Sequence, residues 1–94
     1  MEQKQYSMDE LIEIVHILRK DCPWDSVQTH DSLKNCLIEE TYEVLEALDS
    51  GVGETMADEM GDLLMQILLH AEIGAENGEY TLEDVTSALA NKMI

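Results

Sequence analysis

Apolar residues recur every three or four positions along most of the chain, which is the spacing of one face of an α-helix. The first such stretch predicts a helix over about residues 8–20, which Ser7 and Glu10 open as a capping box and Pro23 closes. The segment CPWDSVQTH, residues 22–30, has no apolar period and is predicted to form an ordered loop.

The second predicted helix carries an apolar stripe that ends near residues 49–51, and either Thr29 or Asp31 can cap its start. A Gly-Val-Gly turn at residues 51–53 then leads to a long third helix that ends at about residues 77–78. Because the connection is short, these two helices should run antiparallel as a hairpin.

A short fourth helix is predicted after Thr81 and Asp84, which repeat the capping-box pattern with Asp in place of Glu. Four helices with short connections, 45% apolar residues and no Phe predict an all-α fold. We expect an antiparallel bundle of about four helices, in one domain over residues 1–94. The second and third helices are too apolar all round for so small a monomer, so dimerisation or a higher homo-oligomer should complete the bundle.

Acidic residues dominate the charge of the chain, because 21 Asp and Glu accompany 5 Lys and Arg, for a formal net charge of −16. Such a chain repels a phosphate backbone and lacks the basic patch of a nucleic-acid-binding protein. Polymeric DNA or RNA is therefore not expected as a partner. A small phosphorylated ligand is compatible with this charge if divalent cations reverse the local field.

Cys22 and Cys36 form no CxxC pair, and no charged-then-apolar leader opens the sequence. Two reduced thiols in a cytoplasmic protein are therefore expected. No apolar run approaches the roughly 20 residues that span a bilayer, so we expect a soluble protein with no membrane partner.

Two acidic pairs interrupt the otherwise apolar second and third helices: Glu39-Glu40-x-x-Glu43 and Glu59-x-x-Asp62. Residues three positions apart share a helix face, and the two pairs lie at comparable distances from the hairpin turn. The hairpin should therefore bring four carboxylates together, where they repel one another unless a cation joins them. A solvated acidic face is the alternative interpretation, but the apolar neighbours of both pairs favour a metal site.

All-oxygen ligands favour the hard ions Mg²⁺ and Mn²⁺, because di-iron bundles use Glu-x-x-His pairs and zinc sites use His or Cys. No Glu-x-x-His occurs at these positions. His16, His30 and His70 are scattered in the sequence, and each is more typical of a surface or loop histidine than of a metal ligand. A P-loop motif is also absent.

The segments CPWDSVQTHDSLK, LIEETYEVLEAL and DEMGDLLMQILLHA occur in this order, and with them the chain resembles the MazG family of nucleoside triphosphate pyrophosphohydrolases over about residues 8–94. The resemblance implies an all-α homodimer that uses Mg²⁺ to hydrolyse nucleoside triphosphates to monophosphate and pyrophosphate, often to remove non-standard nucleotides. In the family a basic segment resembling RRHPHVF usually follows the last helix, whereas this sequence ends at Ile94. A truncated or naturally short form of the domain is therefore expected.

The resemblance also assigns roles to the acidic residues. Glu40, Glu43, Glu59 and Asp62 occupy the positions of the family's metal ligands, and Glu39 occupies that of the residue that orients or deprotonates the attacking water. Metal ions that bridge phosphate oxygens would polarise the α-phosphorus and stabilise the pyrophosphate leaving group.

Three further residues are candidates for substrate binding. Trp24 could pack against a nucleobase, although a loop Trp in a small core is as often a structural plug. Lys34 could meet a phosphate, although a surface lysine paired with nearby acids is more common. Gln28 is a weaker candidate from the same loop.

The leading functional hypothesis is therefore a Mg²⁺-dependent nucleoside triphosphate pyrophosphohydrolase. A noncatalytic nucleotide-binding or dimerisation module of a larger protein is the alternative, and a purely structural helical bundle comes third. In that last case the acidic residues would be surface charge.

Overall fold

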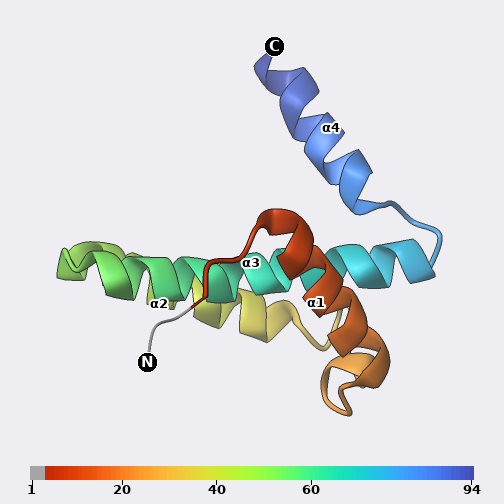
Figure 1. Ribbon diagram of the computed structural model, residues 1–94, viewed down its shortest axis with the longest axis horizontal. Coiled ribbons are helices and arrows are strands. Elements are labelled where there is room, and N and C mark those ends of the chain that lie inside the picture. The colour runs from red at the N-terminus through yellow and green to blue at the C-terminus, as the bar shows by residue number, and fades with distance from the viewer. Residues whose placement is uncertain (1–3) are drawn as a thin grey trace.

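A computed structural model describes residues 4–94 of the chain. Four α-helices follow one another, and one short 3₁₀ helix lies in the first connection; no strand occurs among the described residues (Figure 1). This confirms the predicted all-α class. The elements are α1 (Met8–Asp21), η1 (Asp25–Val27), α2 (Lys34–Ser50), α3 (Gly53–Glu76) and α4 (Leu82–Met93).

The two predicted capping boxes are both present. At the start of α1, the Glu10 backbone N–H donates to Ser7 Oγ at 3.1 Å, and the Ser7 N–H donates to the Glu10 carboxylate at 2.9 Å. Thr81 and Asp84 exchange the equivalent pair of hydrogen bonds at the start of α4. Each box satisfies two N–H groups at a helix start, which explains where these helices begin.

The predicted cap of α2 was wrong. Helix α2 begins after Leu33, which makes no capping hydrogen bond with its side chain. Thr29 and Ser32 instead bond one another's backbone N–H groups, at 3.0 and 2.8 Å, and close a separate turn just before the helix. Asp31 forms an ion pair with Lys34 at 2.7 Å, so its carboxylate is not available to cap. The segment over residues 22–30, predicted to be an ordered loop, contains η1.

Helices α2 and α3 form the predicted antiparallel hairpin (Figure 1). Gly51 ends α2 with a φ of 71°, a left-handed conformation that suits glycine because it has no Cβ. Helix α1 crosses α3 and packs against it (Figure 1). The buried cluster at the centre of the molecule draws on α1, α3 and the turn before α2, and its members are Val15, Leu33, Leu68, Leu69 and Ile73.

Helix α4 extends away from the other three helices (Figure 1), and every one of its residues after Leu82 is exposed. Its connection to α3 is fixed by Tyr80, whose hydroxyl donates to the His70 carbonyl at 2.9 Å. The Tyr80 ring lies against Gly74, where an added Cβ would come within 2.5 Å of it. Three helices therefore build the core of one chain, and dimerisation stays a prediction.

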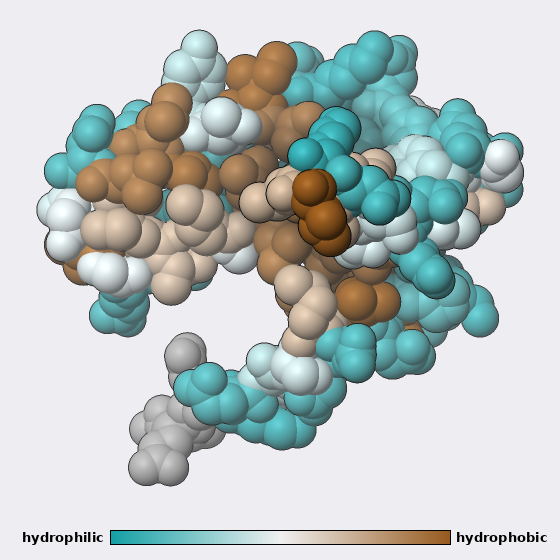
Figure 2. Space-filling view, turned by 90° about the horizontal axis from the view of Figure 1, so that it is seen from above, coloured by the Kyte–Doolittle hydropathy of each residue, from teal (hydrophilic) through white to brown (hydrophobic). Residues whose placement is uncertain are grey.

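Large apolar side chains also remain on the surface. Figure 2 shows apolar side chains gathered at the left of the view, over the turn end of the α2–α3 hairpin. Exposed residues of this kind in that region are Leu45, Leu48, Val52 and Met60. Within the described part of the chain, no helix combines the length and the apolar character that crossing a membrane would require.

Candidate metal centre between α2 and α3

Four carboxylates meet at the middle of the α2–α3 hairpin, and they come from Glu40, Glu43, Glu59 and Asp62. One oxygen of each lies within 4.8 Å of the corresponding oxygens of the other three. Two ligands come from each helix, at a spacing of three residues, so the helical repeat aims each pair at the partner helix. The structure thus brings together the four residues that the sequence pattern paired.

Mutual repulsion and burial change the acidity of this cluster. The pKa of Glu40 is raised, first by burial and then by the charges of Glu43 and Asp62. The pKa of Glu59 is raised to about 7, mainly because its protonated form hydrogen-bonds Glu43, with burial and neighbouring carboxylates adding to the effect. A proton on Glu59 therefore relieves part of the repulsion near neutral pH when no cation is bound.

The cluster is also short of hydrogen-bond donors. Glu40 Oε2 and Glu59 Oε2 are buried and accept no hydrogen bond. None of the ion pairs among residues 4–94 includes a member of the cluster. A hard divalent cation such as Mg²⁺ or Mn²⁺ takes carboxylate oxygens as ligands and would replace the missing donors. The donor set therefore fits a metal ion.

Glu39 lies beside this group without joining it. It is exposed on α2, and its charge contributes to the raised pKa of Glu40. Such a carboxylate can accept a proton or a hydrogen bond from a water molecule at the edge of a metal site.

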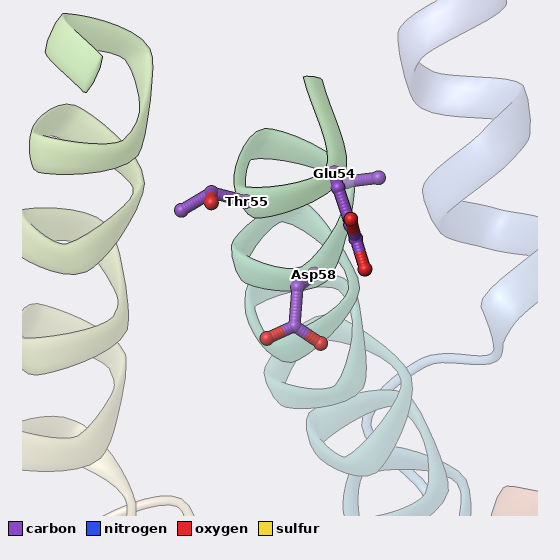
Figure 3. Close-up of a pocket in the computed structure, with 4 residues that line it drawn as sticks. Glu54, Thr55 and Asp58 are labelled. Atoms are coloured by element: carbon purple, nitrogen blue, oxygen red, sulfur yellow. The ribbon is translucent and has the colours of Figure 1, made fainter. Parts of the chain in front are cut away.

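A surface hollow adjoins the cluster on the side of the hairpin turn. Its volume is about 410 Å³, and its lining includes Glu43, Glu46 and Glu59. A larger hollow of about 550 Å³ lies at the first turns of α3 and includes none of the four clustered carboxylates. Figure 3 shows that Thr55, in the lining of this larger hollow, points toward α2, whereas Glu54 points to the other side of α3.

The predicted substrate residues Trp24 and Gln28 lie far from the cluster within one chain. The guanidinium of Arg19 donates to the carbonyls of Asp25 and Gln28 and holds this loop beside Glu76. Asp62 and Glu76 are 14 positions apart on α3, about 21 Å of helix.

The side chains of this loop differ in how free they are. Trp24 is 53% exposed, so it does not plug the core. Gln28 is engaged at both ends, because its Nε2 donates to the Trp24 carbonyl and its Oε1 accepts from Ser32. Lys34 begins α2 and is paired with Asp31. The structure does not bring these residues to the carboxylates, and their contact with substrate stays a prediction.

A second polar cluster escaped the sequence analysis. His30 Nδ1 lies 2.8 Å from His70 Nδ1, and His30 Nε2 lies 2.7 Å from a Glu79 carboxylate oxygen. The two imidazole rings are nearly parallel. These residues looked scattered because they are 40 positions apart, but the hairpin register that sets Glu40 opposite Asp62 also sets His30 opposite His70.

Comparison with known proteins gives a consistent result. Residues 28–94 match the family model described as the MazG nucleotide pyrophosphohydrolase domain. The chain is 44% identical over 96 residues to the nucleoside triphosphate pyrophosphohydrolase/pyrophosphatase MazG of Thermotoga maritima, across 100% of this chain and 38% of that protein.

Two further relatives illustrate the range of similarity. Identity is 51% over 73 residues to the uncharacterized protein YabN of Bacillus subtilis, across 78% of this chain and 15% of the relative. It is 35% over 89 residues to the nucleoside triphosphate pyrophosphohydrolase of Escherichia coli K12, across 92% of this chain and 34% of that protein. The chain thus spans well under half the length of each.

Proposed function

Because the chain belongs to the MazG nucleotide pyrophosphohydrolase domain family, we propose that it hydrolyses nucleoside triphosphates to monophosphate and pyrophosphate with the aid of Mg²⁺. The observation that carries this proposal is the close group of four carboxylates, none of which has a cationic partner in the part of the chain that the structure describes. Non-standard nucleotides are included among the proposed substrates. The free thiols of Cys22 and Cys36 are compatible with the cytoplasm as the place of action.

In this proposal Glu40, Glu43, Glu59 and Asp62 would hold the metal. A bound divalent ion supplies charge neutralisation for the phosphate oxygens and lowers the pKa of a coordinated water. Glu39 accepts a proton from the attacking water while the water oxygen forms a bond to the α-phosphorus. The bond from that phosphorus to the bridging oxygen breaks, and the electron pair leaves with pyrophosphate.

The test measures pyrophosphate release from a panel of standard and modified nucleoside triphosphates, with Mg²⁺ or with EDTA. We expect metal-dependent release by the wild-type chain. Glu40→Gln should reduce it at least about 100-fold, since even outer-shell partners of a metal site are worth about 10–100-fold. Glu13→Gln, the same change on the exposed face of α1, serves as the matched control and should have no effect.

Equal activity of the Glu40→Gln variant and the wild type would refute the metal assignment. No release by the wild type, combined with Mg²⁺-dependent nucleotide binding, would favour the noncatalytic module.

We also propose that the chain acts as a homodimer. Support comes from α2, where Ile38, Tyr42 and Leu45 are at least half exposed and follow one another at helical spacing. Sedimentation equilibrium at micromolar concentration should give twice the chain mass of 10.6 kDa. Leu45→Lys should shift it toward the monomer, whereas Val27→Lys, at an exposed position outside α2, should not. A monomeric wild type would refute the dimer.

A further inference from the structure

Two polar side chains, each with a buried acceptor atom, continue the line of the carboxylates along α3. Asp62, Gln66 and His70 are spaced by four residues and therefore share one helix face. Asp62 meets the acids of α2, and His70 meets His30 just before α2, so the face between them is turned toward α2. Gln66 lies on that face and is only 7% exposed.

Gln66 lacks a partner for its acceptor. Its Oε1 is fully buried and accepts no hydrogen bond, and the same is true of His70 Nε2. A buried acceptor without a donor costs about 1–3 kcal/mol, so native proteins rarely keep one without a use for it. In the described part of the chain, every buried side-chain polar atom of this kind belongs to Glu40, Glu59, Gln66 or His70.

The hydrogen bonds of His30 determine what His70 can offer. His30 Nε2 carries its proton, because it contacts the Glu79 carboxylate. With His30 neutral, its Nδ1 accepts from the Nδ1–H of His70, and His70 Nε2 is left with a lone pair. Burial lowers the pKa of His70, which favours this neutral ring. Gln66 and His70 thus present two acceptors in succession.

The charges around the cluster indicate which way a nucleotide would lie. On the side of the hairpin turn the adjoining hollow is acidic, with Glu43, Glu46 and Glu59 in its lining. Metal-bound phosphates suit that side, whereas an uncharged nucleoside gains nothing there. On the other side Gln66 is one helical turn, about 6 Å, from Asp62, close to the step from an α-phosphate to its nucleoside.

We propose that Gln66 is a specificity-determining residue whose side-chain oxygen, together with His70 Nε2, accepts hydrogen bonds from the nucleoside of the substrate. The proposal rests on the proposed function, because it needs the triphosphate at the carboxylate cluster. A site built to accept such hydrogen bonds discriminates strongly against a ligand that lacks the donor, since its acceptors are then left buried and unpaired.

The test is calorimetric binding in Ca²⁺, which is used in place of Mg²⁺ to limit turnover. The probes are the four common deoxynucleoside triphosphates and inorganic triphosphate, which has no nucleoside. Gln66→Met keeps the length of the side chain but removes the acceptor. It should weaken the preferred nucleotide about tenfold or more and leave inorganic triphosphate unchanged. Gln5→Met, at an exposed position, is the matched control.

The melting temperature of the variant distinguishes a binding role of Gln66 from a structural role, because loss of a structural side chain would lower it. Without ligand, Gln66→Met should melt at the same temperature as the wild type or higher, because an unpaired buried acceptor is gone. Gln66→Leu repeats the test with a different shape if the Met variant folds poorly. Lower stability with unchanged preference for nucleotide over inorganic triphosphate would overturn the proposal, and so would an equal loss of both ligands.

The same data separate this inference from the proposed function. A wild type that binds nucleotides no more tightly than inorganic triphosphate contradicts the role of Gln66, whatever its catalytic activity. A wild type that prefers nucleotides through Gln66 but releases no pyrophosphate in Mg²⁺ contradicts hydrolysis alone.

Discussion

The carboxylates in the middle of the α2–α3 hairpin are unpaired, whereas those at its open end are paired with basic side chains. In the middle, four carboxylates face one another, and none of them is ion-paired with a cation among residues 4–94. At the open end, Arg19 donates two hydrogen bonds to the Glu76 carboxylate, at 2.7 and 2.9 Å, and His30 meets Glu79. Both clusters join segments that are distant in sequence. The difference between them therefore lies in how their charges are paired.

Two glutamates on α3 make the difference explicit. The pKa of Glu59 is raised to about 7 by Glu43, burial and further acids, whereas the pKa of Glu76 is lowered by its hydrogen bond and charge contact with Arg19. Glu76 belongs to a cluster in which positive and negative groups pair with each other, as a structural role requires. Glu59 belongs to a cluster whose carboxylates have no cationic partner among the described residues, an arrangement that is typical of a binding site.

The largest effect should come from breaking the paired cluster. Arg19 is 10% exposed at its side chain and also donates to the carbonyls of Asp25 and Gln28. Arg19→Met should therefore lower the free energy of unfolding by about 3 kcal/mol, because it leaves two partly buried carbonyl acceptors unpaired. Urea unfolding measures the change, with Lys20→Met at the exposed neighbouring position as control. Equal stability of the two variants would show that the hydrogen bonds of Arg19 do not stabilise the fold.

Most of the fold followed from local chemistry that the sequence displays. The capping boxes at Ser7 and Thr81 and the turn at Gly51 depend on residues within a few positions of one another, so their pattern predicted helix ends. The start of α2 did not follow, because Thr29 found a closer partner in Ser32. The direction of α4 depends on the packing of Tyr80 on Gly74, a contact that no helical period encodes.

The site was predictable to the extent that it depends on hairpin register. The spacing of Glu40 and Asp62 from the turn brought the carboxylates together, and the same reasoning could have paired His30 with His70. Gln66 has no such signature, because a Gln inside an apolar helix looks like any polar substitution until its burial and missing donor are known. Trp24 shows the converse, because its motif suggested contact with the substrate, whereas the structure places it in a loop far from the acids.

A smaller effect, which salt should weaken further, is the pH dependence of the unpaired cluster. The folded-state pKa of Glu59 lies above its ordinary value of 4.5, so its contribution to stability is present at low pH and is lost as pH rises through about 7. His70 works in the opposite sense, because its lowered pKa costs stability as pH falls below its ordinary value of 6.5. At pH 6.5 the two effects still oppose each other, and the effect of His70 fades as pH rises further, so the carboxylates should control most of the change above this value.

Thermal melts without metal, from about pH 6.5 to about pH 8, should show a falling midpoint for the wild type. Mg²⁺ should flatten this slope, because the cation replaces the proton that Glu59 loses. Glu40→Gln should flatten it as well, without metal, since one of the repelling charges is gone. Salt at about 0.15 M should reduce the slope, given that part of the cluster is open to solvent. A wild-type midpoint that is equal at both pH values, with and without Mg²⁺, would mean that the four carboxylates behave as ordinary surface charge, and the contrast between the two ends of the hairpin would disappear.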